Sequence, residues 1–216
     1  PQLLRPEPSA PVGAIPATFT VTREGKAQYT VPIPVPPGRA GLQPDLALVY
    51  SSDRQLGPLG VGWSLSGLSS IQRCGSTVAQ DEVLKPVKWS SEDHFCLDGE
   101  RLVAVNGQYG MNGTEYRTER ESYAKIVSYG QGPSYFTVWR KNGLIQTYGC
   151  DAETGGSTAA DACSALIMAR NNLPRAWALR QTKDRNENYV LYNYQKDASD
   201  ASEDWDLSGS VDGTEY

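Results

Sequence analysis

His94 is the one histidine of this chain, and its imidazole is the side chain most readily used for acid–base chemistry. It follows Asp93, so the pair could be a general base with a carboxylate that orients it. Cys96 lies two residues further on and would share a strand face with His94. Because no serine or cysteine nucleophile can be assigned to this pair by sequence, we predict no catalytic centre here.

The four cysteines could bind a metal, form disulfides or remain free thiols. They lack the CxxC spacing of zinc sites, and His94 is the only histidine that could join them. Disulfides are therefore favoured, with buried free thiols as the alternative. Closing the polar loop between Cys150 and Cys163 would contribute about 3 kcal/mol in the chain-entropy model. Disulfides also indicate export to an oxidising compartment, so we expect a secreted, extracellular protein. The candidates Cys74, Cys96, Cys150 and Cys163 allow three pairings.

The acidic stretch DWDLSGSVDGTE has the spacing of a twelve-residue calcium loop. However, Tyr189 to Tyr194 favours a strand, so the helix that enters such a loop is missing. A solvated acidic loop is the alternative, and calcium binding stays open; we predict no cofactor and assign no metal ligand. The matching positions are Asp204, Asp206, Ser208, Gly209, Ser210 and Glu215.

The elements that must position these residues are strands. In the glycine-rich block from Pro36 to Cys74, Leu46, Leu48 and Tyr50 alternate with small residues as strand residues do. Trp63 supplies a large apolar anchor in a segment of otherwise small side chains. Glycines at this density turn the backbone or let two chains approach closely. The fold class we predict is all-β, a glycine-rich antiparallel sheet with many hairpins.

Turn signals punctuate the chain between the predicted strands. We expect hairpins at Glu24–Gly25, Leu97–Glu100, Val105–Gln108 and Lys141–Leu144, the last two with the Asn-Gly pair that favours type I′ turns. A short helix is predicted only from Ala159 to Ala169.

Composition limits the organisation and the partners. Ten of the fourteen prolines precede residue 45, and we expect residues 1–16 to form a flexible, proline-rich arm and residues 17–216 one β domain. Residues 197–216 hold seven acidic residues and no basic one, and removing these charges from the net charge of -5 leaves +2. No basic stripe is visible, which argues against nucleic acid. No apolar run is long enough to cross a bilayer, so membrane insertion is not expected.

Five stretches carry a resemblance to a known family. The first is the block Pro36 to Cys74, and together the five cover most of residues 17 to 194. In these stretches the chain resembles the N-terminal domain shared by the Salmonella virulence plasmid B protein and the B components of insecticidal Tc toxin complexes, which are relatives of RHS/YD-repeat proteins. The other four stretches are HFCLDGERLVAVNGQYG (His94 to Gly110), GTEYRTERESYAKIVSYG (Gly113 to Gly130), GPSYFTVWRKNGLIQTYG (Gly132 to Gly149) and WALRQTKDRNENYVLYNY (Trp177 to Tyr194).

The resemblance implies a structural role. It implies that the chain contributes to a larger curved β shell of RHS/YD-repeat type, continuing beyond this chain, that encapsulates or delivers a separate toxic domain. The implied partners are the remainder of its own toxin polypeptide or toxin-complex subunits, with a host surface as a further candidate. Cys74 and Cys96 both fall in family-like blocks, which favours the sequential pairing Cys74–Cys96 and Cys150–Cys163.

Two further patterns match known motifs only in part. Glu119 and Glu121, with Ser157–Thr158 downstream, are similar to the acidic pair and Ser-Thr element of ADP-ribosyltransferases, but the order is reversed. We expect the two glutamates on one solvated strand face, and not an enzyme. Lys183 to Tyr194 resembles a YD-type repeat with Glu187 at the position of the turn glycine. This departure leaves the turn geometry open, and Asn186 or Asn188 could take the left-handed conformation.

Two functions are therefore compared. The first is a non-catalytic part of a toxin-delivery shell. The alternative is a secreted β-sheet module that recognises a glycan or a cell-surface protein through exposed aromatic residues such as Trp89, Tyr109 or Tyr135. The resemblance favours the shell.

Overall fold

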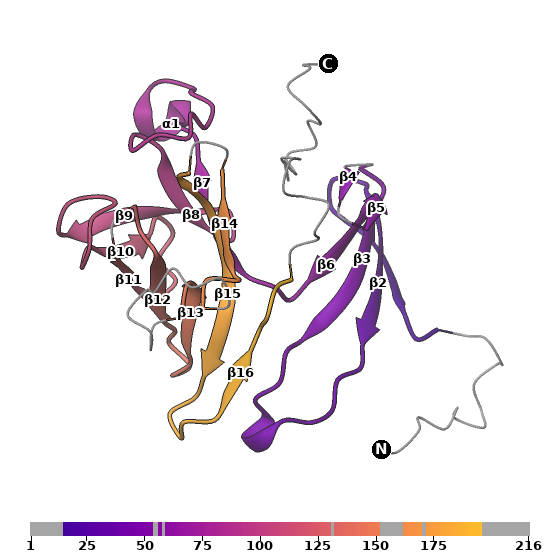
Figure 1. Ribbon diagram of the computed structural model, residues 1–216. Helices are drawn as coiled ribbons and strands as arrows, with labels where there is room; N and C mark the ends of the chain where they lie inside the picture. Colours follow the sequence, from indigo (N-terminus) through magenta and orange to yellow (C-terminus); the bar gives the residue numbers. More distant parts are fainter. Residues whose placement is uncertain are drawn as a thin grey trace. The chain divides into compact units, whose positions relative to one another are not determined.

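The computed structural model describes residues 15–53, 56–57, 59–130, 132–151, 162–169 and 172–195. The chain divides into two compact units. The first comprises Pro1–Pro36, Pro44–Gly67 and Trp205–Tyr216, and the second comprises Pro37–Gln43 and Leu68–Asp204. Nearly all regular structure in the described residues is antiparallel β-strand, which confirms the predicted all-β class (Figure 1). The predicted arm falls almost entirely outside these residues.

The first unit contains a four-stranded sheet and a two-stranded ladder. Their strands are β1 (Thr18–Val21), β2 (Ala27–Ile33), β3 (Leu46–Ser51), β4 (Leu56–Gly57), β5 (Gly60–Val61) and β6 (Trp63–Ser66). The four-stranded order is β1-β2-β3-β6, and β4 pairs with β5. The predicted hairpin at Glu24–Gly25 is confirmed, because β1 and β2 pair directly across it.

Alternation along these strands gives the four-stranded sheet one apolar and one polar face. Tyr50 and Trp63 are cross-strand partners on the apolar face, with ring centroids 5.5 Å apart. No residue of the four strands is fully buried. Trp63, predicted as the large apolar anchor of this segment, packs its indole against Tyr50 on this face of the sheet.

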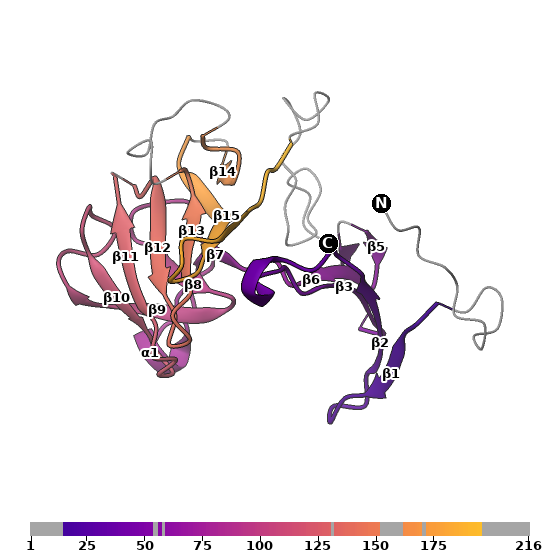
Figure 2. The same cartoon turned by 90° about the horizontal axis from the view of Figure 1, so that it is seen from below.

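The second unit is a closed antiparallel barrel. Its elements are β7 (Ser70–Cys74), α1 (Val78–Asp81), β8 (His94–Leu97), β9 (Glu100–Asn106), β10 (Glu115–Thr118), β11 (Lys125–Tyr129), β12 (Tyr135–Trp139), β13 (Ile145–Gly149), β14 (Leu166–Met168), β15 (Pro174–Lys183) and β16 (Tyr189–Leu191). Each of β7 to β12 pairs with the next strand, and β15 pairs with both β13 and β7, so eight strands form a ring (Figure 2).

The long strand β15 closes the barrel because its two halves pair differently. Ala176–Ala178 pair with β7, whereas Leu179–Lys183 pair with β13. The short strands β14 and β16 also pair with β15: β14 pairs near its start, and β16 pairs near its end. This closure joins residues about a hundred positions apart in sequence, and local turn signals do not predict it.

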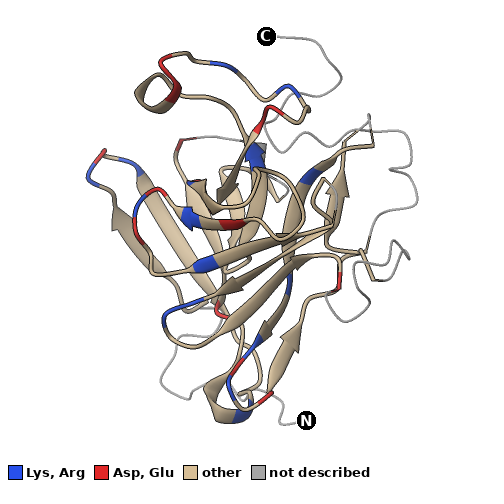
Figure 3. Ribbon diagram, turned by 90° about the vertical axis from the view of Figure 1, so that its left-hand side faces the viewer, with Lys and Arg blue, Asp and Glu red and all other residues tan. Residues whose placement is uncertain are grey.

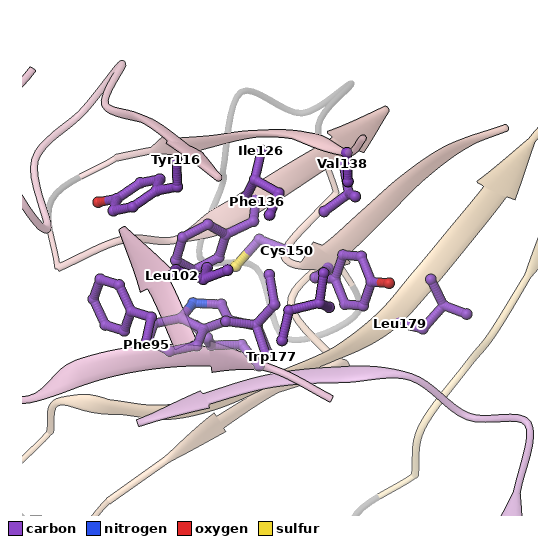
Figure 4. Packing of buried hydrophobic residues seen from close by; sticks show 14 residues of the cluster. Phe95, Leu102, Tyr116, Ile126, Phe136, Val138, Cys150, Trp177 and Leu179 are labelled. Carbon is purple, nitrogen blue, oxygen red and sulfur yellow. The ribbon is translucent and has the colours of Figure 1, made fainter. Parts of the chain in front are cut away.

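Aromatic side chains fill the barrel (Figure 4). Trp177 is fully buried and packs edge to face with Phe95 and Phe136, with ring centroids 5.3 and 5.0 Å apart. Its indole N–H donates to the carbonyl of Pro133 at 2.9 Å, which satisfies the polar end of the ring. Burying a side chain of the size of Phe136 contributes about 1.5–3 kcal/mol.

The hairpin turns differ in detail from those predicted. Asp98 and Gly99 both have positive φ, so Leu97–Glu100 forms the expected two-residue turn. At Lys141–Leu144 the Arg140 amide donates to the Leu144 carbonyl, which makes a three-residue loop with Gly143 left-handed. At Val105–Gln108 the chain does not turn back at once; β9 and β10 are joined by an eight-residue connection, residues 107–114.

The prediction of a single helix is wrong. The segment expected to be helical, Ala159 to Ala169, contains strand β14 in its described part, because residues 166–168 pair with β15. Such backbone pairing outweighs weak helix propensity. The described α-helix is instead α1, which the sequence did not signal.

Candidate functional site

The connection between β7 and β8 forms a structured feature on the surface of the barrel unit. It carries α1 and returns through a bridge between Ser76 and Lys85. Between this connection and strand β9 lies a surface groove of about 870 Å³, lined by residues that include Cys74, Cys96 and Arg101. The groove contains several of the residues considered for chemistry.

Arg101 fastens α1 to the barrel wall. Its guanidinium forms a two-pronged pair with the Asp81 carboxylate, at 2.5 and 2.7 Å, and also donates to the side chain of Gln80 at 2.9 Å. Hydrogen bonding from Arg101 holds the pKa of Asp81 well below its usual value. The same bond raises the pKa of Arg101. This pair therefore stays charged and serves to hold the connection in place.

His94 and Asp93 do not form the base and orienter pair that was considered. The Asp93 carboxylate accepts hydrogen bonds from the amides of Lys88 and Ser90, both at 2.8 Å. The acid near His94 is instead Asp81, whose Oδ1 lies 3.6 Å from Nε2. Burial and then the positive Arg101 lower the pKa of His94, against the opposing effect of Asp81.

The four cysteines form two disulfides in the structure, with the sequential pairing. Cys74 and Cys96 are joined on the outer face of β7 and β8, with Cα atoms 5.9 Å apart. Cys150 and Cys163 are joined across the loop that follows β13, with Cα atoms 4.0 Å apart. A sulfur held in a disulfide is not a thiolate nucleophile, so Cys96 adds no reactive group to His94.

Glu119 and Glu121 lie in the turn between β10 and β11, not on a strand face as predicted. Glu119 accepts a hydrogen bond from the side chain of Gln80, whereas Glu121 accepts one from the amide of Tyr123 at 2.6 Å. The two carboxylates thus have separate structural partners. Ser157–Thr158 lies outside the described residues.

The calcium-loop motif, Asp204 to Glu215, also lies outside the described residues. Within the described ranges, no three His, Cys, Asp or Glu side chains gather in a way that could hold a metal ion. Nor does any helix in those ranges have the length and apolar character needed to span a membrane.

The aromatic residues considered for surface recognition, Trp89, Tyr109 and Tyr135, contact other side chains of the same chain. Tyr109 stacks on Phe95 with ring centroids 5.2 Å apart, and its hydroxyl accepts from the Phe95 amide at 2.6 Å. Burial raises the pKa of Tyr109. Tyr135 stacks on Tyr129, and the Arg175 guanidinium lies over Trp89 at 5.4 Å.

Sequence reasoning missed two polar clusters near the ends of β7. Arg73 enters the barrel interior, where Nε donates to the Pro174 carbonyl at 2.6 Å and one terminal nitrogen donates to the Ser90 carbonyl at 2.7 Å. It also lies over the rings of Phe95 and Trp177. Its only sequence signal is a charged residue at an inward position of a strand.

The second cluster surrounds the hydroxyl of Tyr148. This hydroxyl lies 2.8 Å from the Ser69 hydroxyl and 3.1 Å from Arg140, while the Ser69 hydroxyl donates to Asp98 at 2.6 Å. Burial raises the pKa of Tyr148. The cluster ties three segments together through complementary donors and acceptors, which is a structural arrangement and not an assembled acid, base and nucleophile.

Charges of both signs are interspersed along the ribbon (Figure 3). The ion pairs of the barrel unit illustrate this, since Glu115 lies between Arg117 and Lys125, at 2.7 and 3.3 Å.

Curated proteins of similar sequence come from Salmonella. The Mono(ADP-ribosyl)transferase SpvB of Salmonella typhimurium is 26% identical in an alignment of 216 positions that covers 88% of this chain and 32% of that protein. The protein of the same name from Salmonella dublin matches to the same extent. The chain thus spans about a third of the length of the curated relatives it matches.

Solved structures with the same fold come from toxin complexes and from SpvB. The crystal structure of TcdB2-TccC3 matches with a TM-score of 0.64 and 20% identity, covering 87% of this chain and 9% of that chain. The Photorhabdus luminescens Tc holotoxin pore gives a TM-score of 0.61 and 19% identity, covering 83% and 8%. The N-terminal domain of effector protein SpvB from Salmonella typhimurium strain LT2 gives 0.59 and 23%, covering 86% and 59%.

At these identities the structural matches establish the fold. The sequence family is established separately, because the model of the Salmonella virulence plasmid 65kDa B protein matches residues 21–210, most of the chain. The chain belongs to the Salmonella virulence plasmid 65kDa B protein family.

Proposed function

We propose that this chain is a non-catalytic structural part of a bacterial toxin or virulence protein, which contributes to a β shell that encloses or delivers a separate toxic domain. The observation that carries the proposal is the packed barrel. Its interior is filled by Trp177, Phe136 and their neighbours, so the unit is built as a rigid block and not around a substrate cavity. The fold shared with TcdB2-TccC3 supports the same role.

The proposed absence of catalysis rests on the described side chains and on the extent of the match. His94, Asp93 and Cys96 have separate structural partners, as do Glu119 and Glu121. The match covers 32% of the Mono(ADP-ribosyl)transferase SpvB, and we place ADP-ribosyl transfer in the remaining part of such proteins. We expect the purified chain to transfer no labelled ADP-ribose from NAD. Transfer that is lost in the Glu121→Ala variant would contradict this expectation.

The remaining elements of the proposal concern location and partners. Two disulfides fit a protein that acts in an oxidising, extracellular environment. The partners are then the rest of the toxin polypeptide or the subunits of its complex. Nucleic acid and membrane insertion by this chain have no part in the proposal.

Protease protection tests the shell role. The longer toxin polypeptide would be digested with and without residues 1–216, and survival of the separate toxic domain would be followed by mass analysis. We expect the toxic domain to resist digestion in the longer polypeptide and to be cleaved when the chain is removed. Equal survival in both proteins, with the remainder folded by circular dichroism, would count against the shell role.

A further inference from the structure

The four-stranded sheet of the first unit presents an apolar face on which no residue is fully buried. We call it the apolar sheet face. Phe19 and Val21 are each 63% exposed, and Tyr29 is 38% exposed. Cross-strand pairing places all members on one side: Phe19, Val21, Ala27, Tyr29, Val31, Ile33, Leu46, Leu48, Tyr50, Trp63 and Leu65.

The opposite face of the same sheet is suited to water. It carries mainly threonine, serine and glutamine side chains, together with the apolar residues Pro32, Ala47 and Val49; the polar members include Thr18, Thr20, Gln28, Thr30, Ser64 and Ser66. A sheet with one apolar face gains stability in water when a second layer covers that face. A contiguous apolar patch of this kind marks a contact surface.

The chemistry of the apolar sheet face defines what can cover it. It contains no charged residue, so a strongly acidic or basic partner would form no ion pair there. Its aromatic and β-branched side chains stand in regular cross-strand rows, from Phe19 and Tyr29 to Tyr50 and Trp63. Rows of this kind interdigitate with the apolar face of a second sheet, at a spacing of about 10 Å.

The relatives contain enough further chain to supply that second sheet. The match covers 32% of the Mono(ADP-ribosyl)transferase SpvB and 9% of the TcdB2-TccC3 chain. We infer that the apolar sheet face docks against the apolar face of a β-sheet in the remaining part of its own toxin polypeptide. This inference rests on the proposed shell function and adds the surface through which the shell is joined.

Hydroxyl-radical footprinting tests the contact directly. Phe19 and Tyr29 report on the apolar sheet face, and Tyr123, which is 72% exposed in the barrel unit, is the control. We expect all three to be oxidised in the 216-residue chain, and only Tyr123 to stay reactive in the longer toxin polypeptide. Equal reactivity of Phe19 and Tyr29 in both proteins overturns the inference. Protection in the 216-residue chain that rises with its concentration also overturns it, because the occupant is then a second copy.

A matched pair of variants separates the two faces. Val31 lies on the apolar sheet face and Val49 on the opposite face, on neighbouring strands, and both are half-buried. Valine to threonine preserves shape and adds a hydroxyl. In the longer polypeptide, Val31→Thr should weaken docking roughly tenfold and raise the oxidation of Phe19, whereas Val49→Thr should not. In the 216-residue chain the two variants should melt alike; equal effects in the longer polypeptide overturn the inference.

Failure of this inference differs from failure of the shell function. If the toxic domain is protected from protease while Phe19 and Tyr29 stay reactive, the chain is part of the shell but another surface joins it. If Phe19 and Tyr29 are protected while the toxic domain is digested equally with and without the chain, the contact stands and the shell function is wrong.

Discussion

At the scale of single residues, Arg73 shows how the barrel tolerates a buried charge. The side chains of Arg73 and Asp93 are 3% and 4% exposed, and their charged atoms lie 3.8 Å apart. Burial lowers the pKa of Arg73, an effect that the nearby Asp93 opposes. Two carbonyls accept its N–H groups, so the guanidinium replaces its lost hydration with hydrogen bonds.

Replacing Arg73 should therefore lower the free energy of unfolding by more than the loss of its own contacts alone. Arg73→Met leaves the Asp93 carboxylate buried without its counter-ion, and we expect a loss of about 3–5 kcal/mol in unfolding free energy. Urea unfolding followed by tryptophan fluorescence measures this. The double variant Arg73→Met/Asp93→Asn should recover part of the loss, and strictly additive effects would show that the two charges do not interact.

His94 gives the fold a pH dependence of known sign. Its pKa is lowered from the usual 6.5, so the unfolded chain binds a proton more readily than the folded chain. Stability should fall as pH drops through 6.5 and continue to fall until the folded-state pKa is passed. Thermal melts between pH 7 and pH 5 should show a smaller decline for His94→Gln than for the natural chain. An identical decline in both would assign the effect to other groups.

At the scale of elements, three hairpins share one turn geometry. In each, an amide donates to the carbonyl four residues on, and the fourth of the five residues is left-handed. That residue is Gly25 in the first turn, Gly143 in the second and Glu187 in the third. Neither Asn186 nor Asn188 takes this conformation, because Asp184 Oδ1 accepts both of their amides and fixes the turn around Glu187.

Glu187→Gly should stabilise the chain. A left-handed conformation costs a residue with a side chain roughly 1 kcal/mol more than glycine, and the lost ion pair with Lys183 is exposed and weak. We expect a gain of about 0.5–1 kcal/mol in unfolding free energy. Asn186→Gly is the matched control, since it adds flexibility without relieving a left-handed residue, and it should not stabilise.

At the scale of the whole molecule, the barrel depends on contacts between distant segments. Strand β15 closes the ring, Trp177 fills it, and Cys150–Cys163 closes the loop that leads from β13 toward β14. The sequential disulfide pairing should be visible by non-reducing mass analysis of the exported protein. Four alkylatable thiols would refute it.

Loss of the Cys150–Cys163 disulfide should lower the free energy of unfolding. Cys150→Ser/Cys163→Ser opens a loop of thirteen positions, and we expect a loss of about 3 kcal/mol in unfolding free energy. The barrel should remain folded, because its strand pairing does not pass through this loop. Unfolding at the same urea concentration as the natural chain would mean that the bridge is not formed.

The sequence by itself determined the local features of this protein. Alternation in Leu46–Tyr50 predicted a strand, and the Asp98–Gly99 pair predicted a tight turn, because both depend on neighbouring residues alone. Family motifs also indicated the pairing of the cysteines. Tertiary structure decided the rest: barrel closure by β15, the strand at Leu166–Met168 and the burial of Arg73. Each of these depends on partners far along the chain, whose hydrogen bonds and packing outweigh local propensity.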